Sequence, residues 1–286
     1  KNEYVIKVTG KIVERESKNT KIATGEIEVE VSKLELINKS KEVPFAIQDE
    51  TNALEDTRLK YRYLDLRREA LKNNFVIRNN VTFATRKFLN SLDFLEVETP
   101  ILCKSTPEGA RDYLVPSRVN KGKFYALPQS PQIFKQLLMV SGFERYFQIA
   151  KCFRDEDLRA DRQPEFTQID VEMSFVDEDQ VMWLGENLVA SIFKDVKGID
   201  VELPLMRMKY DDAMDKYGSD KPDLRFEMPI KNITEVFKNT EFTVFKNVIE
   251  NNGIINCLVV KGEAENYSRK ALDQLTDFVK TYRASG

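Results

Sequence analysis

The sequence contains no histidine, and this absence excludes several classes of enzyme at once. Catalysis by a Ser-His or Cys-His pair needs an imidazole base, and zinc chemistry with histidine ligands is excluded for the same reason. If the chain is an enzyme, we expect it to work by positioning its substrates and compensating their charges.

Cysteines are scarce as well. The three that occur, Cys103, Cys152 and Cys257, form no CxxC pair, and their odd number argues against a disulfide framework. We expect buried thiols in a reducing compartment, and therefore a cytoplasmic protein. No apolar run reaches the roughly 18–20 residues of a membrane span, and no secretory signal is visible, so we expect no membrane partner.

Neither sign of charge dominates. The 44 lysines and arginines nearly balance the 47 aspartates and glutamates, which gives a formal net charge of −3. This balance provides no global attraction to nucleic acid, so any RNA contact must come from local patches. The chain has 286 residues, of which 42% are hydrophobic, and this is enough for two or more domains with buried cores.

The most informative segment, 153–170, is rich in charge; one apolar run precedes it and another begins within its last residues. Residues 146–150 and 166–175 alternate as strands do, so the segment is expected to form a β-hairpin. A solvated surface hairpin is the simplest reading of its charge. However, Gln168 and Asp170 recur at period two inside an apolar strand, which favours a wet, functional face of the sheet.

This hairpin resembles motif 2 of the class II aminoacyl-tRNA synthetases, in the form found in bacterial aspartyl-tRNA synthetases. The matching residues are Phe153-Arg154-Asp155-Glu156-Asp157 and Gln163-Pro164-Glu165-Phe166-Thr167-Gln168-Ile169-Asp170. The resemblance implies an α+β fold, in which a class II antiparallel sheet is flanked by helices. Part of an OB-fold β-barrel would precede this sheet, and a small α+β insertion domain would follow it.

The first 57 residues are expected to form a small domain and a linker. Strands at 4–13 and 25–31 predict a β module within residues 1–40, with lysines and arginines around it. By resemblance this is part of the OB-fold that binds the anticodon; a generic β module is the alternative. Residues 41–57 are polar and turn-rich and are interpreted as a linker or hinge.

The catalytic domain is expected to span residues 58–230. Its first charged run, 58–68, resembles the opening of the synthetase domain, although a solvated helix face would look the same. A helix at 76–92 and a strand at 94–100 resemble motif 1, which implies a homodimer formed through these elements. The apolar stripe of the helix consists of Val81, Ala84, Phe88 and Leu92.

A loop and a helix follow motif 1. Residues 103–118 have turn chemistry and resemble a lid that closes over the amino acid. A helix is then expected to start with Ser130 as N-cap and Pro131 at the first position. Lys135 lies on its first turns; it is either an ordinary lysine reaching water or a fixed cation for a carboxylate.

The last part of the chain is interpreted as an insertion domain, residues 231–286 (GAD-like), possibly incomplete. A helix at 178–197 comes before it. Within it we expect strands at 242–245 and 254–260 and a helix at 268–282. That helix is expected to bury five side chains: Leu272, Leu275, Phe278, Val279 and Tyr282.

The resemblance implies an ATP-dependent aspartate–tRNA ligase. L-aspartate would attack ATP to give aspartyl-adenylate, and the aspartyl group would pass to the 3′ end of tRNA. Arg154 is expected to be the catalytic residue that bridges carboxylate and phosphate. The expected aspartate-binding residues are Glu108, Gln132, Ile133, Phe134, Lys135 and Arg154. The expected ATP-binding residues are Arg154, Asp155, Glu156, Gln163 and Phe166.

Substrate choice would depend on Lys135. A buried cation left unpaired against asparagine costs on the order of 3–5 kcal/mol, which would favour aspartate. The tRNA partner is tRNA(Asp), and whether tRNA(Asn) is also charged is left open.

Motif 3, with its second ATP-binding arginine, has no counterpart in the sequence. Mg²⁺ is expected as well, with no ligand in this chain. We therefore expect a truncated part of a longer protein, also because it starts at Lys1, and we expect it to be inactive alone. The alternative is a non-catalytic RNA-binding or regulatory protein on a synthetase scaffold.

Overall fold

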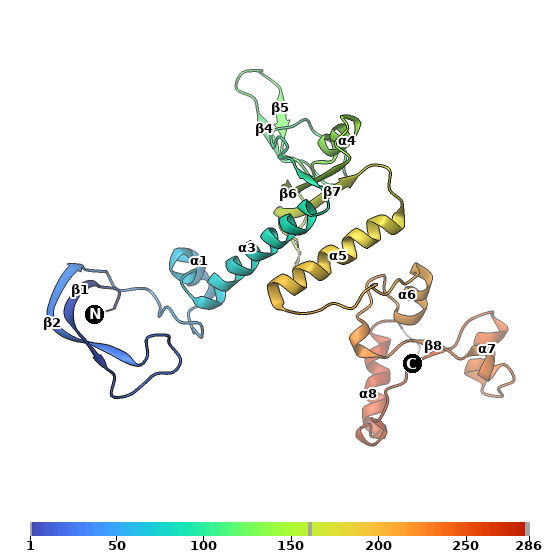
Figure 1. Ribbon diagram of the computed structural model, residues 1–286. Helices are drawn as coiled ribbons and strands as arrows, with labels where there is room; N and C mark the ends of the chain where they lie inside the picture. The colour runs from blue at the N-terminus through green and yellow to red at the C-terminus, as the bar shows by residue number, and fades with distance from the viewer. Residues whose placement is uncertain (1, 160–161, 284–286) are drawn as a thin grey trace. The chain divides into compact units, whose positions relative to one another are not determined.

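The chain folds into two compact units, and the boundary between them lies at Leu203 and Pro204. The structure is a computed structural model that describes residues 2–159 and 162–283 (Figure 1). The unit boundary lies before residue 231, the expected start of the insertion domain. The assignment of residues 231–286 to that domain stays a prediction.

The N-terminal β-hairpin agrees with the expected strands. Strand β1 (Val5–Glu14) pairs antiparallel with β2 (Ile27–Asn38), and a register shift falls between Thr9 and Gly10. A Cβ atom on Gly10 would lie 2.1 Å from the carbonyl oxygen of Glu30, so only glycine allows the strands to approach so closely. The OB-fold assignment of this hairpin stays a prediction.

The charged run at 58–68 is more than a solvated face. Helices α1 (Glu55–Lys60) and α2 (Arg62–Asp65) precede the long helix α3 (Glu69–Asn90). The carboxylate of Asp65 is fully buried and accepts a hydrogen bond of 2.9 Å from Arg68, which is also buried. This bond lowers the pKa of Asp65. The charges therefore fix the start of α3.

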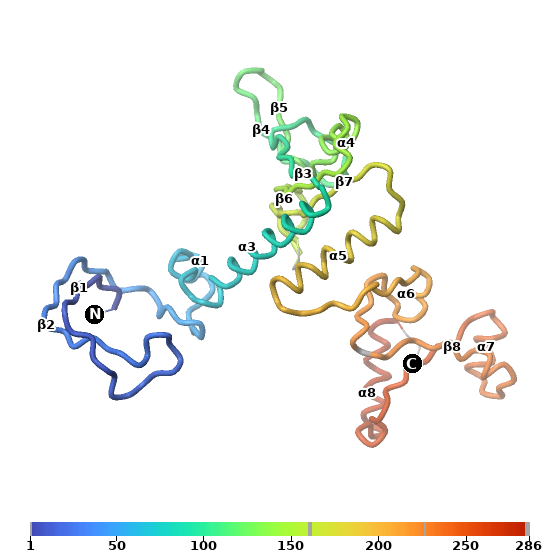
Figure 2. The backbone as a smooth tube through the Cα atoms, viewed as in Figure 1, coloured from blue at the N-terminus to red at the C-terminus, as the bar shows by residue number. Residues whose placement is uncertain are grey.

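A three-stranded sheet carries the centre of the first unit. Its order is β3 (Leu95–Glu96), β6 (Arg145–Phe153) and β7 (Glu165–Met173), as Figure 2 traces, with β3 parallel to β6 and β7 antiparallel to it. The hairpin expected at the charged loop is thus confirmed. The strand expected at 94–100 is shorter, because only two of its residues pair with β6.

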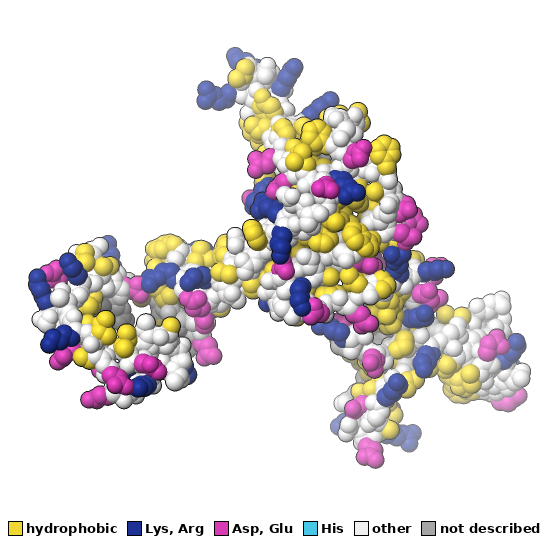
Figure 3. Space-filling view, in the orientation of Figure 1, with side chains coloured by type: hydrophobic (Ala, Val, Ile, Leu, Met, Phe, Trp, Pro, Cys, Tyr) yellow, Lys and Arg dark blue, Asp and Glu magenta, His cyan; other side chains and the backbone are white. Residues whose placement is uncertain are grey.

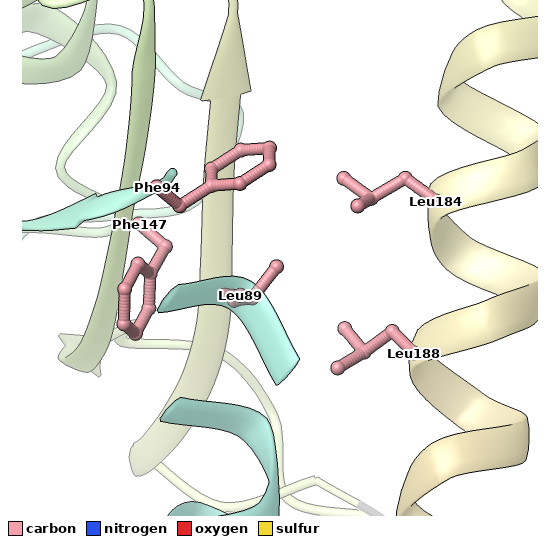
Figure 4. Close-up of a cluster of buried hydrophobic side chains, with 5 residues drawn as sticks. All are labelled: Leu89, Phe94, Phe147, Leu184 and Leu188. Carbon is pink, nitrogen blue, oxygen red and sulfur yellow. The ribbon is translucent and has the colours of Figure 1, made fainter. Parts of the chain in front are cut away.

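The core lies between this sheet and two helices, α3 and α5 (Glu178–Lys197). It consists of Leu89, Phe94, Phe147, Leu184 and Leu188 (Figure 4). The figure shows Leu184 and Leu188 pointing from α5 toward the other three side chains. Helix α5 has the expected bounds.

The apolar stripe of α3 packs largely inside this chain. Ala84 is buried, and Phe88 and Leu92 pack against the core cluster. Phe88 and Leu92 are only partly buried by these contacts, so the expectation that a second chain covers part of this stripe stays a prediction. On α3, Val76 and Phe83 are 47% and 68% exposed.

The remaining elements of the first unit frame the site, and the second unit is mostly helical. In the first unit they are β4 (Leu114–Pro116), β5 (Phe124–Ala126) and α4 (Gln132–Val140). The second unit contains α6 (Tyr210–Tyr217), β8 (Lys231–Asn232), α7 (Thr243–Glu250), β9 (Asn256–Cys257) and α8 (Arg269–Lys280). Its short 3₁₀ helices are η1 (Leu224–Phe226), η2 (Thr234–Phe237) and η3 (Ala264–Asn266).

Three expectations for the second unit are wrong. The segment expected as a strand at 242–245 is mostly helix α7, in which Phe245 packs edge-on against Phe237 and Phe242. The strand expected at 254–260 is reduced to β9. Helix α8 begins after Ser268 as expected, but its apolar side chains are not buried. The exposed ones are Leu272, Leu275, Phe278 and Tyr282.

Candidate functional site

The β6–β7 hairpin has two different faces, and the candidate site lies on one of them. Phe147 pairs with Val171 on the face that packs in the core. One residue further along, Gln148 stands opposite Asp170, and Cys152 stands opposite Phe166. The polar alternation in the sequence thus marks a real second face, which we call the site face.

Arg154 follows the last residue of β6. Its backbone N–H donates to the carbonyl of Pro164 at 2.9 Å, which closes the hairpin at this point. Its guanidinium carbon lies 5.0 Å from the ring centroid of Phe166. The Nε atom is buried and donates to no described residue. Since a buried donor without an acceptor is costly, this atom is a candidate for binding an anion.

A cavity of 760 Å³ opens at this end of the hairpin. Four of the five expected ATP-binding residues line it: Arg154, Glu156, Gln163 and Phe166. Other lining residues, Arg78, Lys151 and Arg162, add positive charge. Within it Glu156 accepts a hydrogen bond from Arg162 at 3.1 Å.

Asp155 is absent from the lining of this cavity. Its backbone N–H donates to the carbonyl of Arg111 at 3.0 Å, and the Arg111 guanidinium donates to the carbonyl of Asp155 at 3.3 Å. The loop after β6 is thereby hydrogen-bonded to the expected lid segment.

Lys135 lies on the first turn of α4 and its side chain is only 11% exposed. Its ammonium nitrogen lies 3.2 Å from Asp170 Oδ2 and 3.3 Å from Glu172 Oε2. Two carboxylates of β7 thus already hold this ammonium, whereas the sequence analysis expected it to be left unpaired against asparagine. Lys135 and Asp170 are brought together although 35 residues separate them.

Asp170 is the residue that sequence reasoning placed on the site face without giving it a role. Burial raises the pKa of its carboxyl group, and the Lys135 ammonium opposes this rise. Its Oδ1 atom is buried and accepts no hydrogen bond from a described residue. Asp170 thus combines a fixed lysine on one oxygen with an open acceptor on the other.

The rest of the site face is a hydrogen-bonded network of polar side chains. Gln148 Oε1 accepts from Tyr146 at 2.8 Å and from Thr99 at 3.0 Å. Cys152 donates to Gln168 Oε1 at 3.2 Å, and burial raises the pKa of this thiol to about 11. Because the thiol stays protonated near neutral pH, Cys152 serves as a hydrogen-bond donor and not as a nucleophile.

Glu108 lies in the expected lid and is exposed. Its carboxylate accepts hydrogen bonds from Ser130 at 2.7 Å and from Thr106 at 3.1 Å. The prediction that Ser130 caps α4 is wrong, since Pro131 occupies the N-cap position and no side chain caps the helix. Ser130 instead links the lid to the start of α4.

Gln129 was missed by the sequence analysis, and nothing in the sequence pattern distinguishes it. Its side chain is 1% exposed. Its amide accepts from the Ala110 N–H at 3.1 Å and donates to the Ala110 carbonyl at 2.9 Å and to Asp112. Burial disfavours ionised Asp112, but bonds from Ser105 and Gln129 outweigh it and lower its pKa. Gln129 therefore anchors the middle of the lid segment.

The three remaining candidates share the first turn of α4 with Lys135. Ile133 is 48% exposed, while Gln132 and Phe134 are half-buried. Gln132 forms no side-chain hydrogen bond with the described residues, so its amide is available to a ligand. The described part of the chain contains no group of three or more His, Cys, Asp or Glu side chains that could hold a metal ion.

An antiparallel hairpin with an arginine at its strand end, helices on one face and a polar site face is the core of a class II aminoacyl-tRNA synthetase. Residues 54–276 match the family model described as tRNA synthetases class II (D, K and N). The chain belongs to this family.

Curated proteins and solved structures agree with this assignment. The chain is 57% identical over its whole length to an aspartate–tRNA ligase of Staphylococcus haemolyticus and 57% identical to an aspartate–tRNA(Asp/Asn) ligase of Bacillus mycoides. It spans about half the length of each, 49%. A putative aspartyl-tRNA synthetase of Leishmania major superposes with a TM-score of 0.59 at 27% identity, covering 68% of this chain and 38% of the other.

Proposed function

We propose that this chain is part of an ATP-dependent aspartate–tRNA ligase that works in the cytoplasm. One observation carries the proposal. Arg154 lines a cavity large enough for a nucleotide, its guanidinium carbon lies 5.0 Å from the centre of the Phe166 ring, and its buried Nε atom has no acceptor among the described residues. The names of the curated relatives support aspartate as the amino acid. No helix of the described residues is long and apolar enough to cross a membrane.

The first reaction step brings two anions together, the α-carboxylate of aspartate and the α-phosphate of ATP. A planar guanidinium can donate to both at once, which offsets their repulsion. Arg154 is fixed by its backbone bond and by Phe166, so little reorganisation is needed when the anions arrive. Glu156, Gln163 and the free face of Phe166 are proposed to hold the adenosine. Mg²⁺ would be needed to compensate the phosphates, and we assign no residue of this chain to it.

Lys135 is proposed to read the side chain of aspartate with help from Asp170 and Glu172. An ammonium group has three donors, and in this structure each of the two carboxylates places one oxygen within 3.3 Å of it. The third donor is left for the substrate carboxylate. Because Lys135 is never wholly unpaired, rejection of asparagine through this residue should be weaker than the full cost of a buried lone charge.

Gln132 and Glu108 are proposed to bind the amino group of aspartate, and Ile133 and Phe134 to form the wall of that pocket. The tRNA partner is tRNA(Asp). The two relatives of equal identity differ in whether their names include tRNA(Asn). Residues 1–40 are proposed to belong to an anticodon-binding OB-fold and residues 231–286 to an insertion domain.

The direct test is an exchange assay on a chimera that joins this chain to the unmatched part of the Staphylococcus haemolyticus relative. We expect labelled pyrophosphate to enter ATP only when aspartate is present, and asparagine to support little exchange. RNA binding without any exchange would instead favour the non-catalytic alternative.

We also propose a homodimer that uses the outer face of α3. Val76 and Phe83 are separated by seven residues, so they lie on one side of the helix, and both are exposed. We expect the chain to sediment as a dimer at micromolar concentration and Phe83→Glu to shift it to monomers by at least about tenfold in dissociation constant, since a charge would be buried. Val140→Glu, at an 86% exposed position on α4, is the matched control and should leave the dimer intact. A monomeric parent chain would contradict the proposal.

A further inference from the structure

The loop between β4 and β5, residues 117–123, concentrates positive charge on a chain that is otherwise slightly acidic. It contains Arg118, Lys121 and Lys123, and no aspartate or glutamate occurs anywhere from residue 113 to residue 143. Figure 3 shows dark blue side chains gathered at the tip of this hairpin. A local cationic patch on a protein of net charge −3 is the kind of feature that binds a polyanion.

The three cations are exposed, and none forms an ion pair with a described residue. Some exposed lysines elsewhere in the chain do have acidic partners, as Lys194 has Asp200 at 2.6 Å and Lys216 has Asp212 at 2.9 Å. The charge of the loop is therefore uncompensated within the described structure. The positive electrostatic field of the loop therefore acts on any ligand that approaches the tip.

The loop is ordered by its own hydrogen bonds. Ser117 N–H donates to the Lys123 carbonyl at 2.9 Å, and Lys123 N–H donates to the Asn120 carbonyl at 3.1 Å. The Ser117 hydroxyl accepts from the Asn120 N–H at 3.1 Å, and Gly122 has a φ of +74° that suits glycine. The backbone positions of the three cations are thus fixed before any ligand binds, which lowers the entropy cost of ordering the loop on binding.

The base of the hairpin adjoins the candidate site. Ala126, the last residue of β5, exchanges backbone hydrogen bonds with Cys103 at the start of the lid segment. Leu127 N–H donates to Tyr113, and Gln129, the lid anchor, comes two residues later. In Figure 1 the loop projects away from β6 and β7. The hairpin is therefore an arm that begins at the rim of the site and ends in a cationic tip.

We propose that the β4–β5 loop binds the sugar-phosphate backbone of the RNA whose end enters the site. This inference rests on the proposed function, because that function places an RNA end at the rim from which the arm starts. Contacts to phosphates position a nucleic acid without reading its sequence, and lysine and arginine are the usual donors. The tip has only one strongly exposed apolar side chain, Val119, at 90%, too little to anchor a lipid surface.

The test compares two triple variants of the 286-residue chain. Arg118→Ala/Lys121→Ala/Lys123→Ala removes the tip charges. Lys246→Ala/Lys261→Ala/Lys270→Ala removes three exposed charges of the second unit that form no ion pair with a described residue. Each protein is titrated with a labelled tRNA(Asp) transcript at several KCl concentrations between about 50 and 200 mM. We expect the tip variant to bind at least about tenfold more weakly and its slope of log K against log[KCl] to shrink by about 0.9 for each of the three cations that contacts a phosphate. The control should bind like the parent chain.

Unchanged affinity and slope in the tip variant would overturn the proposal. The proposal would also be overturned if the tip variant lost binding to vesicles of phosphatidylcholine and phosphatidylserine but bound RNA like the parent chain. That result would assign the tip to an anionic lipid. ATP binding and pyrophosphate exchange of the chimera are measured on the same variants and should not change. If the chimera without substitutions shows no exchange, the result counts against the proposed function alone. If the tip variant gives the same RNA titration as the parent chain, the result counts against the proposed role of the loop alone.

Discussion

Arg154→Ala should abolish most of the aspartate-dependent exchange of pyrophosphate into ATP, with a fall of about 10²–10³-fold in the chimera described above. The physical reason is that the guanidinium is the one buried, unsatisfied cationic donor on the site face of the described chain. Without it the carboxylate and the phosphate meet uncompensated, and two charge-assisted hydrogen bonds are lost in the transition state. ATP affinity, measured by calorimetry, should fall much less than the exchange rate.

Two substitutions control this result. Arg154→Lys keeps the charge but loses the planar fork, so we expect it to recover only a small part of the rate. Arg225→Ala removes an exposed arginine that pairs with Asp223 two residues away and should leave exchange unchanged. A fall of less than about tenfold in Arg154→Ala, roughly 1.4 kcal/mol, would show that Arg154 is not the phosphate clamp.

The second large effect is expected from Lys135→Leu, and it has two separate parts. Removing the lysine leaves the buried Asp170 carboxylate without its counter-charge, which should lower the free energy of unfolding by about 3 kcal/mol. It should also raise the KM for aspartate steeply while ATP affinity stays nearly unchanged. Unfolding in urea can be followed through the single tryptophan, Trp183, which lies on α5.

A second substitution separates these two parts. Lys135→Leu/Asp170→Asn removes both charges of the buried pair, so stability should partly return while aspartate binding remains lost. Lys151→Leu is the surface control: its partner Glu165 is 2.8 Å away and both side chains are about half exposed, so we expect a cost below about 1 kcal/mol. Equal loss of ATP and aspartate binding would mean that Lys135 supports the fold or the phosphates.

The stability of the Lys135→Leu variant should depend on pH. Burial already raises the pKa of Asp170 above 3.8, the value expected for the unfolded chain, and loss of Lys135 removes an effect that opposes the rise. Between these two pKa values the folded state binds more protons than the unfolded state. The stability of Lys135→Leu should therefore decrease as pH rises through this window, and the double variant should not show the decrease.

The strongest sequence signals predicted the fold around the site well. Period-two alternation gave both strands of the β6–β7 hairpin, and Asp177 and Gly198 bracket α5 as a capping box and a left-handed C-cap. The contacts that were missed are long-range ones. The partners of Lys135 lie 35 and 37 residues away, and no periodicity encodes which strand faces the start of a helix.

The second unit was predicted less well for a different reason. Residues 242–249 mix phenylalanine, valine and isoleucine, which strands also favour, and a short run of this kind fits either period. In the folded chain, contacts of the Phe245 ring with Phe237 and Phe242 stabilise a helix there. On α8 the amphipathic pattern was recognised correctly. Such a pattern identifies the apolar face of a helix, but it does not identify the element that covers this face.

Because the hairpin has two different faces, the orientation of Arg154 depends on residues that do not contact a substrate. A slip of β6 against β7 by a single residue would carry every site-face side chain to the helices and every core side chain to solvent. Phe147 and Val171, which pack from the sheet against the core side chains of α3 and α5, prevent that slip. Substitutions that seek a new amino-acid preference therefore belong on the site face, where each must keep its hydrogen-bond partners satisfied, and the core-facing side chains of the same two strands should stay unchanged.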